Sequence, residues 1–174
     1  MKKHFLALLL VLTFIFYGAA VKASPESDTH AALQRIYDED SSAARQEGLE
    51  ALYAHHAPDY FEITLKGEKK TLAEVKADAK KIEPYIQSVD FSFSVQDVQF
   101  QGNTTTVKCS FRGDMTLKGP QSETAQHIIT SGTELDTWRK GQNGWMVHQS
   151  KALTENVTDE DGNQLPTDES GVGH

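Results

Sequence analysis

The chain has 174 residues, with 17 basic and 25 acidic side chains and a formal net charge of −8. This length suits one domain with a hydrophobic core, or two domains only if both are small. The negative charge argues against a nucleic-acid partner, because phosphate contacts need clustered positive charge. Cys109 is the single cysteine, so no internal disulfide forms and the domain has to rely on its core for stability.

The N-terminus, residues 1–23, has the features of a secretory signal peptide. Lys2 and Lys3 precede an apolar run over residues 5–17, and small residues follow up to Ala23. Basic, apolar and small residues in this order are typical of a signal peptide, and the apolar run is short for a membrane span. The sequence therefore predicts an exported protein, periplasmic or extracellular, with no stable membrane span once the signal is cleaved.

Three helices are predicted in the N-terminal half of the mature domain. The first begins near residue 28 or 29 and ends near 46, with Asp40 on its apolar stripe. A short second helix is expected over 49–56. Thr71 and Glu74 have the spacing of a capping box, which predicts the start of a third helix.

Beyond this region the apolar residues recur with a period of two, which indicates β-strands. The phase of that period switches near residues 96–97, and a β-bulge there would pair Val98 with Val107 and Phe93 with Phe111. For the following strand the expected register sets Cys109 opposite Thr130.

The last hairpin turns at 141–144, a cluster of residues that tolerate positive φ. Pairing Lys140 with Trp145 sets Asp136 opposite Gln149 and Glu134 opposite Lys151. Alternation then gives one shared face, which includes Glu134, Asp136, Trp138, Trp145, Val147, Gln149 and Lys151. A face with two tryptophans should be covered, so its carboxylates need partners or a cavity. The domain is expected to span 24–156, followed by an acidic disordered tail over 157–174.

This order of elements resembles the nuclear transport factor 2-like superfamily, in particular its SnoaL-like and secreted ketosteroid-isomerase-like members. The residues that carry the resemblance are Leu49–Ala54, Gly67–Val75, Asp136–Trp138 and Gly144–Val147. The resemblance implies an α+β fold in which a cone-shaped, strongly curved antiparallel sheet wraps around three N-terminal-half helices. It also implies a pocket at the open end of the cone, although members range from isomerases and dehydratases to binding domains without chemistry.

Two carboxylates are the candidates for acid–base chemistry in such a pocket, Asp40 from the first helix and Asp136 from the sheet. Burial in apolar surroundings would raise the pKa of either group. The residues expected to contact a ligand are Tyr37, Tyr53, Tyr60, Glu134, Asp136, Trp138 and Gln149. The alternative for the carboxylates is structural, with Asp136 satisfying neighbouring polar groups and Glu134 paired with Lys151.

Motifs for other chemistry are absent from the sequence. The histidines lack metal-ligand spacing, and no nucleophile elbow or glycine-rich phosphate loop occurs. No metal and no cofactor are therefore predicted. A group of lysines over residues 66–81 is interpreted as the solvated face of a helix.

Three functions remain open from the sequence. The first is an exported, non-enzymatic domain that binds a small, mainly apolar ligand, with a homodimer through the sheet as one arrangement. The second is an isomerase, dehydratase or cyclase that uses a pocket carboxylate. The third is a structural or partner-binding domain of the cell envelope.

Overall fold

The structure is a computed structural model that describes residues 25–119 and 124–165. The predicted signal peptide and the end of the predicted acidic tail lie outside the described residues. The elements follow the order α1 (Pro25–Glu47), η1 (Leu49–Tyr53), β1 (His56–Ile63), β2 (Lys69–Thr71), α2 (Leu72–Ile82), η2 (Glu83–Tyr85), β3 (Ile86–Gln101), β4 (Thr104–Leu117), β5 (Gln126–Gly141) and β6 (Gly144–Asp159).

The strands form one six-stranded sheet in the order β2-β1-β6-β5-β4-β3. β1 pairs with β6 in parallel, whereas the other neighbours are antiparallel. The predicted α+β class is confirmed, but the sheet is mixed rather than wholly antiparallel. The parallel pair joins the first strand of the chain, β1, to the last, β6.

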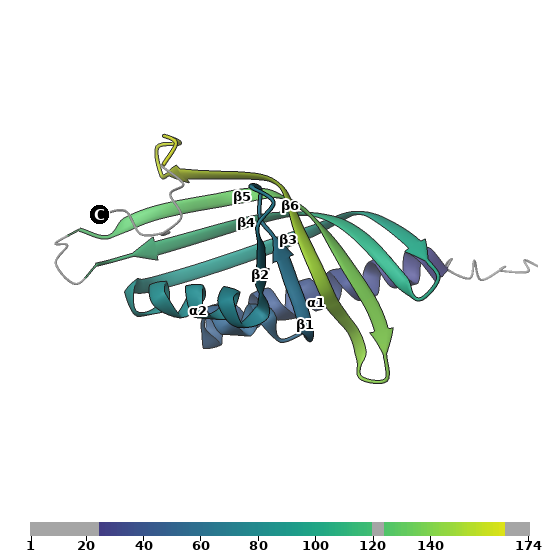
Figure 1. The fold of residues 1–174 in the computed structure, drawn as a ribbon. Coiled ribbons are helices and arrows are strands. Elements are labelled where there is room, and N and C mark those ends of the chain that lie inside the picture. The colour runs from purple at the N-terminus through teal and green to yellow at the C-terminus, as the bar shows by residue number, and fades with distance from the viewer. Residues whose placement is uncertain (1–24, 120–123, 166–174) are drawn as a thin grey trace, which may run out of the picture.

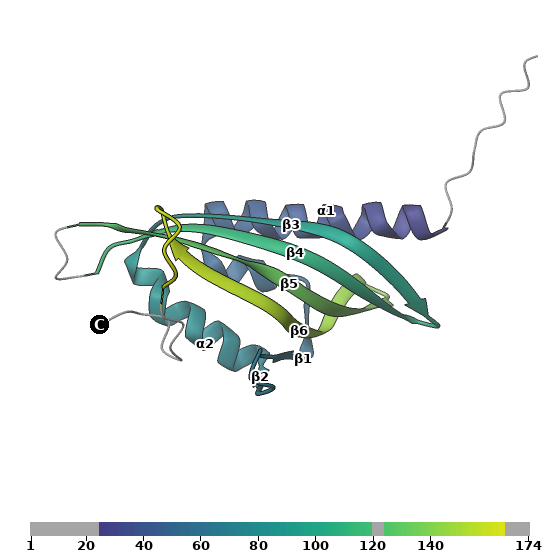
Figure 2. The same cartoon turned by 90° about the horizontal axis from the view of Figure 1, so that it is seen from above.

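Both α-helices lie on the same side of the sheet (Figure 1). α1 runs along β3, and α2 lies near β1 and β2 (Figure 2). The strands β3 to β6 are 14 to 16 residues long and pair along most of their length. They form a long twisted layer, and the expected strong curvature into a cone is not confirmed.

The predicted second α-helix is a five-residue 3₁₀ helix, η1. Gly48 precedes it with φ of +99°, a conformation that favours glycine and interrupts the helical chain. His56 already belongs to β1 and pairs with Val147 of β6, so sheet pairing replaces the helix that the local pattern favoured. The first helix, α1, begins at Pro25, before its predicted start near residue 28 or 29. Proline is well tolerated in a first helical turn.

The capping box at the start of α2 is confirmed. The Thr71 hydroxyl accepts a hydrogen bond from the backbone N–H of Glu74, and the Glu74 carboxylate accepts one from the backbone N–H of Thr71 at 2.7 Å. These two bonds satisfy donors that a helix N-terminus otherwise leaves unpaired.

Substitution of Thr71 by alanine is expected to lower the free energy of unfolding by about 1 kcal/mol, because the cap is lost. Urea denaturation of the wild type and of Thr71→Ala measures this loss. Thr71→Ser, which keeps the hydroxyl, should retain most of the stability. Equal losses in both variants would contradict a capping role.

The β3–β4 register agrees with the prediction. Val98 pairs with Val107 and Phe93 with Phe111, and the register shifts between Val95 and Asp97. The bulge therefore lies where the apolar phase switches in the sequence.

The β4–β5 register differs from the prediction by four residues. Cys109 pairs with Glu134 instead of Thr130, and Phe111 pairs with Gly132. An even shift leaves each side chain on its expected face, because strand faces alternate with period two. A Cβ on Gly132 would lie 2.9 Å from the Phe111 ring, so this glycine makes room for the ring in the observed register.

The β5–β6 register is confirmed near the turn and wrong beyond it. Lys140 pairs with Trp145 and Trp138 with Val147, but a bulge at His148 of β6 shifts the register between Trp138 and Thr137, and a second shift lies between Glu134 and Thr133. Beyond this bulge, Asp136 pairs with Ser150. The extra residue exchanges the two faces of the following part of β6, so a different set of side chains lies on the same face as Asp136.

The core lies between the sheet and the helices, and its buried residues include Leu33, Tyr37, Tyr60, Val75, Val95, Val107, Cys109, Trp138 and Val147. β6 continues to Asp159 rather than ending at residue 156, and Thr158 bridges to Gln164. The first residues of the predicted tail thus belong to the sheet and its turn. Among the described residues, no helix is long and apolar enough to cross a membrane.

Candidate functional site

A cluster of polar side chains lies in the core, on the face of the sheet that α1 covers. Cys109 comes from β4, and Glu134 and Asp136 come from alternate positions of β5. Tyr37 of α1 and Trp138 of β5 complete the cluster. Asp136 is 2% exposed, Trp138 1% and Cys109 0%, so the carboxylate of Asp136 is removed from solvent.

Asp136 is held by a chain of hydrogen bonds. The Tyr37 hydroxyl donates to Oδ2 of Asp136, and the Trp138 indole Nε1 donates to the Tyr37 oxygen at 3.2 Å. The other carboxylate oxygen, Oδ1, has no hydrogen-bond partner among the described residues. Ser150 lies opposite Asp136 and favours its ionised form, but its hydroxyl makes no hydrogen bond to Oδ1.

Burial changes the acidity of the two neighbouring carboxyls. It raises the pKa of Asp136 from 3.8 to about 6, although Ser150, Tyr37 and Cys109 act in the opposite direction. The pKa of Glu134 is also well above its ordinary value, because of burial and then because of the charge on Asp136. Two carboxyls this close titrate as a coupled pair, and their environment favours holding a proton near neutral pH.

Glu134 lacks the partner that the predicted register assigned to it. Ala152 lies opposite Glu134, whereas Lys151 pairs with Leu135 on the other face. The Cys109 thiol donates a weak hydrogen bond to Glu134 Oε1 at 3.4 Å. Protein atoms surround Glu134 on most sides, yet part of its side chain remains exposed, which places it where the cluster meets solvent.

Gln149 does not join this site, which corrects the prediction. It pairs with Thr137, on the face opposite to Asp136. The bulge in β6 brings Ser150 to the position that Gln149 was expected to occupy. No apolar alternation marks this bulge, so it could not be read from the pattern of the sequence.

Tyr53 and Tyr60 lie on the same side of the sheet as the cluster. The His56 ring lies between them, with ring centroids 5.2 Å from Tyr53 and 4.4 Å from Tyr60. Burial raises the pKa of both phenols, and Asp136 and Glu134 raise that of Tyr60 further. Burial lowers the pKa of His56 to about 3, so its ring is neutral. The local sequence pattern places His56 on a helix, so its position between these two rings was not predicted.

Asp40 has a different partner from the one predicted. Its Oδ1 lies 2.7 Å from His55 Nδ1, and the structure shows no contact between Asp40 and Asp136. Burial raises the pKa of Asp40 from 3.8 to about 6, while His55 lowers it. The two predicted carboxylates therefore belong to separate polar groups, an Asp40–His55 pair and the cluster around Asp136.

A pocket of about 200 Å³ lies at another place, where the end of α1 meets the start of β3. Its lining residues are Ala44, Arg45, Gly48, Leu49, Glu83, Ile86, Gln87, Ser88 and Val89. None of the predicted site residues lines it. Arg45 forms an ion pair with Asp90 beside this pocket.

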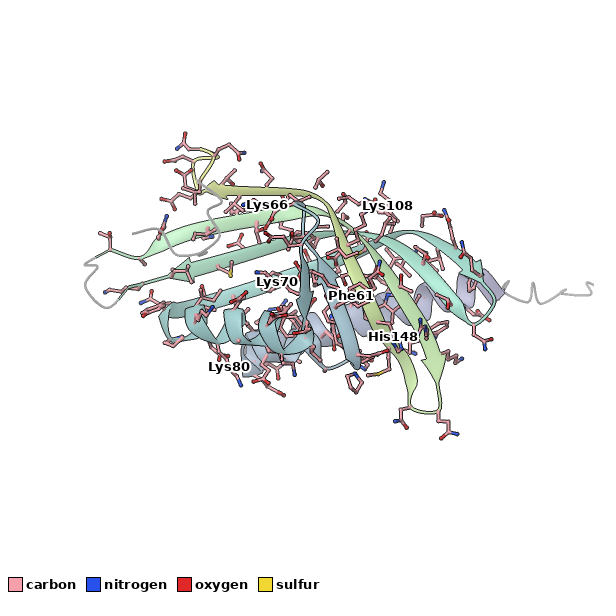
Figure 3. All side chains as sticks on the ribbon, viewed as in Figure 1. Phe61, Lys66, Lys70, Lys80, Lys108 and His148 are labelled. Carbon is pink, nitrogen blue, oxygen red and sulfur yellow. The ribbon has the colours of Figure 1, made fainter. Side chains whose placement is uncertain are left out.

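The lysines near α2 are mostly paired, as expected for a solvated face. Lys70 and Lys81 contact Asp78, and Lys76 and Lys80 contact Glu50. Lys66, Lys70 and Lys80 are spread over the β1–β2–α2 region instead of meeting at one point (Figure 3). This surface therefore offers little concentrated positive charge.

One group of side chains has the composition and spacing to hold a metal ion. Ligand atoms from Cys109, Glu134 and Asp136 all lie within 4.8 Å of one another. The sequence predicted no metal because it offered only scattered histidines. The fold instead brings together a thiol and two carboxyls from neighbouring strands.

The sequence matches no family model and no curated protein. Solved structures are nevertheless similar in fold. A provisionally assigned scytalone dehydratase from Novosphingobium aromaticivorans has 16% identity and a TM-score of 0.63, covering 84% of this chain and 96% of its own. A type 2 hexachlorocyclohexane dehydrochlorinase, LinA, has 13% identity and a TM-score of 0.59, covering 83% and 96%.

A nuclear transport factor 2-like superfamily protein from Salmonella enterica is also similar, with 13% identity and a TM-score of 0.56. The match covers 85% of this chain and 99% of the Salmonella protein. At these identities the likeness concerns the fold, and the folds agree over nearly the whole of each neighbour. The chain therefore has the nuclear transport factor 2-like fold.

Proposed function

We propose that the chain is a small-ligand-binding domain whose ligand contacts Asp136 and Glu134. The observation that carries this proposal is Oδ1 of Asp136, a buried carboxylate oxygen without a hydrogen-bond partner in the described part of the chain. Glu134, two residues away on the same face of β5, keeps part of its side chain exposed to solvent.

The physical cost of this arrangement supports a ligand role. An unsatisfied buried polar atom costs about 1–3 kcal/mol, and a buried charge without a partner costs more. The groups that act on Asp136 and Glu134 are another carboxyl, a thiol and hydroxyls, with no lysine or arginine among them. Strongly perturbed carboxyls of this kind are concentrated at functional sites.

Native mass spectrometry of the protein purified from its own host tests the proposal. The wild type should carry a reproducible adduct that Asp136→Asn loses. Glu68→Gln is the matched control, because Glu68 is an exposed loop carboxylate, and this variant should keep the adduct. A bare mass for the wild type would argue against ligand binding and favour a partner-binding role.

An acid–base enzyme is a second candidate, favoured by the acidity of Asp136. A pKa of about 6 suits a group that exchanges protons near neutral pH, and the Tyr37 hydroxyl is a positioned donor beside it. Two of the structural neighbours are named as a dehydrochlorinase and as a provisional dehydratase.

Turnover of hexachlorocyclohexane and of scytalone is the assay for this candidate. Catalysis by Asp136 would give a rate that changes with pH near 6 and falls at least 100-fold in Asp136→Asn. Activity that survives this substitution would exclude Asp136 as the acid–base group.

Export and dimer formation are further parts of the proposal. The signal-like segment supports export, and Edman sequencing of the host protein should then begin at Ser24.

Phe61, Ile63 and Leu135 are only half-buried and alternate with residues of the helix-covered face, which supports a homodimer through the opposite face of the sheet. Light scattering should give twice the monomer mass, and Leu135→Lys should give the monomer.

A further inference from the structure

We propose that Cys109, Glu134 and Asp136 form a binding site for one divalent metal ion of the Zn²⁺ class. This inference rests on the proposed function, because it names the chemical class of ligand that binds the same carboxyls. It also uses Cys109, which the proposed function leaves without a role.

The distances within the cluster suit a tetrahedral metal site. The Cys109 sulfur lies 3.4 Å from Glu134 Oε1 and 3.8 Å from Asp136 Oδ2. In a tetrahedral zinc site with metal–sulfur and metal–oxygen distances of about 2.3 and 2.0–2.2 Å, sulfur and oxygen ligands are about 3.5 Å apart. The thiol sulfur and the two carboxylate oxygens therefore have the spacing of ligands around one metal ion.

The unpartnered oxygen of Asp136 is a separate observation that points to a ligand. Oδ2 is occupied by the Tyr37 hydroxyl, whereas Oδ1 has no partner among the described residues. Oδ2 is the oxygen that faces the Cys109 sulfur, so it is the ligand atom of Asp136 within the cluster. The hydrogen bond from Tyr37 uses one of its lone pairs and leaves the other for a cation, while Oδ1 is the oxygen of the same carboxylate whose charge has no compensating partner in the described part of the chain.

The neighbours of Asp136 resemble the outer shell of a metal site. Hydrogen bonds from outer residues usually orient the ligands of protein metal sites. Here Trp138 donates to Tyr37 and Tyr37 donates to Asp136. This series of hydrogen bonds fixes the orientation of the Asp136 carboxylate, with Oδ2 toward the Cys109 sulfur.

The types of ligand determine the class of ion. A thiolate with two carboxylates suits Zn²⁺ and similar ions, whereas Mg²⁺ and Ca²⁺ take oxygen ligands and six or more of them. A divalent cation would also compensate the negative charge that two carboxylates and a thiolate place in the core. Binding requires the Cys109 thiol, and any carboxyl of the pair that holds a proton, to release that proton to the solvent.

Titration of the reduced, metal-free wild-type protein with Cd²⁺ tests this site. Cd²⁺ is the probe because a cadmium–thiolate bond gives a near-ultraviolet charge-transfer band. The band should saturate at one equivalent, and protons should be released in step with it. A wild-type protein that gives no such band overturns the inference.

Variants assign the band to the three residues. Cys109→Ser should abolish it, and Glu134→Gln and Asp136→Asn should each weaken Cd²⁺ binding at least tenfold, with thermal unfolding used to verify folding. Glu68→Gln is the carboxylate control. His127→Ala is the control for surface binding, since His127 pairs with Asp114 and Glu160. Both controls should bind as the wild type does.

Two results separate this inference from the proposed function. Cd²⁺ binding that His127→Ala removes and Cys109→Ser leaves intact overturns the metal site. If Cd²⁺ gives no band but the host protein carries an organic adduct that depends on Asp136, the metal site fails and the small-ligand proposal stands.

Discussion

Asp136→Asn is expected to stabilise the ligand-free protein at pH 8 by about 3 kcal/mol and to change its stability little at pH 4. Folding raises the pKa of Asp136 from 3.8 to about 6, and each tenfold change in proton affinity corresponds to about 1.4 kcal/mol. A raised pKa means that the folded state binds the proton more tightly than the unfolded state. The contribution to stability is therefore complete below pH 3.8 and is lost as the pH rises through about 6.

Asparagine removes this loss because it carries no charge, and it still offers an oxygen to the Tyr37 hydroxyl. Urea denaturation of both proteins at several pH values between 4 and 8 measures the difference. Glu68→Gln should follow the wild type at every pH. An Asp136→Asn protein that is less stable than the wild type at pH 8 would indicate that the ionised carboxylate has a structural partner. If the variant is more stable and no longer binds ligand, the Asp136 carboxylate lowers stability but is needed for binding, as is common at functional sites.

Gly132→Val is expected to destabilise the protein by about 3 kcal/mol, because extra atoms do not fit there. A Cβ at Gly132 would collide with the backbone oxygen of Thr154 and lie 2.9 Å from the Phe111 ring. The backbone of β6 cannot move aside without breaking its pairing with β5. Thermal and urea denaturation measure the loss.

Gly141→Val is the matched control for this substitution. Gly141 lies in the same strand, has no atom within 4 Å of an added Cβ and does not have a positive φ. The free energy of unfolding of the Gly141→Val variant should differ from that of the wild type by less than about 0.5 kcal/mol, as for ordinary surface sites. Because valine favours strands more than glycine does, equal losses in both valine variants would show that the contact with Phe111 and Thr154 does not explain the effect.

The sequence predicted the bulge of the β3–β4 hairpin because apolar residues mark both strands. Val95 and Val98 fall in opposite phases, and one extra residue restores both to the same face. The β5–β6 bulge escaped prediction because the part of β6 that follows it is polar. Gln149, Ser150 and Lys151 give no apolar pattern from which a change of face can be read.

The β4–β5 register depended on the length of a connection that local patterns do not determine. The pairing of Cys109 with Glu134 implies a longer connection than the sequence suggested. The register of β4 against β5 is set by long-range packing, including the fit of Phe111 against Gly132. Because the error was even, the expected face of Asp136 and Trp138 was still correct.

The candidate site was predicted in part, and the missing part depends on tertiary structure. Tyr37, Asp136 and Trp138 were placed on inward faces by periodicity alone, and they are in contact. The pairing of Asp40 with His55 needed the position of η1, which the sequence presented as an α-helix. Cys109 was expected opposite Thr130, and its contact with Glu134 follows only from the observed register.

Carbon-13 NMR titration of the aspartate and glutamate carboxyls tests most directly the claim that Asp136 and Glu134 lack a protein counter-charge. We expect Asp136 and Glu134 to titrate as a coupled pair, with the pKa of Asp136 near 6 and that of Glu134 well above its ordinary value. Titration of both groups near their ordinary pKa values of 3.8 and 4.5 in the ligand-free protein would contradict the claim.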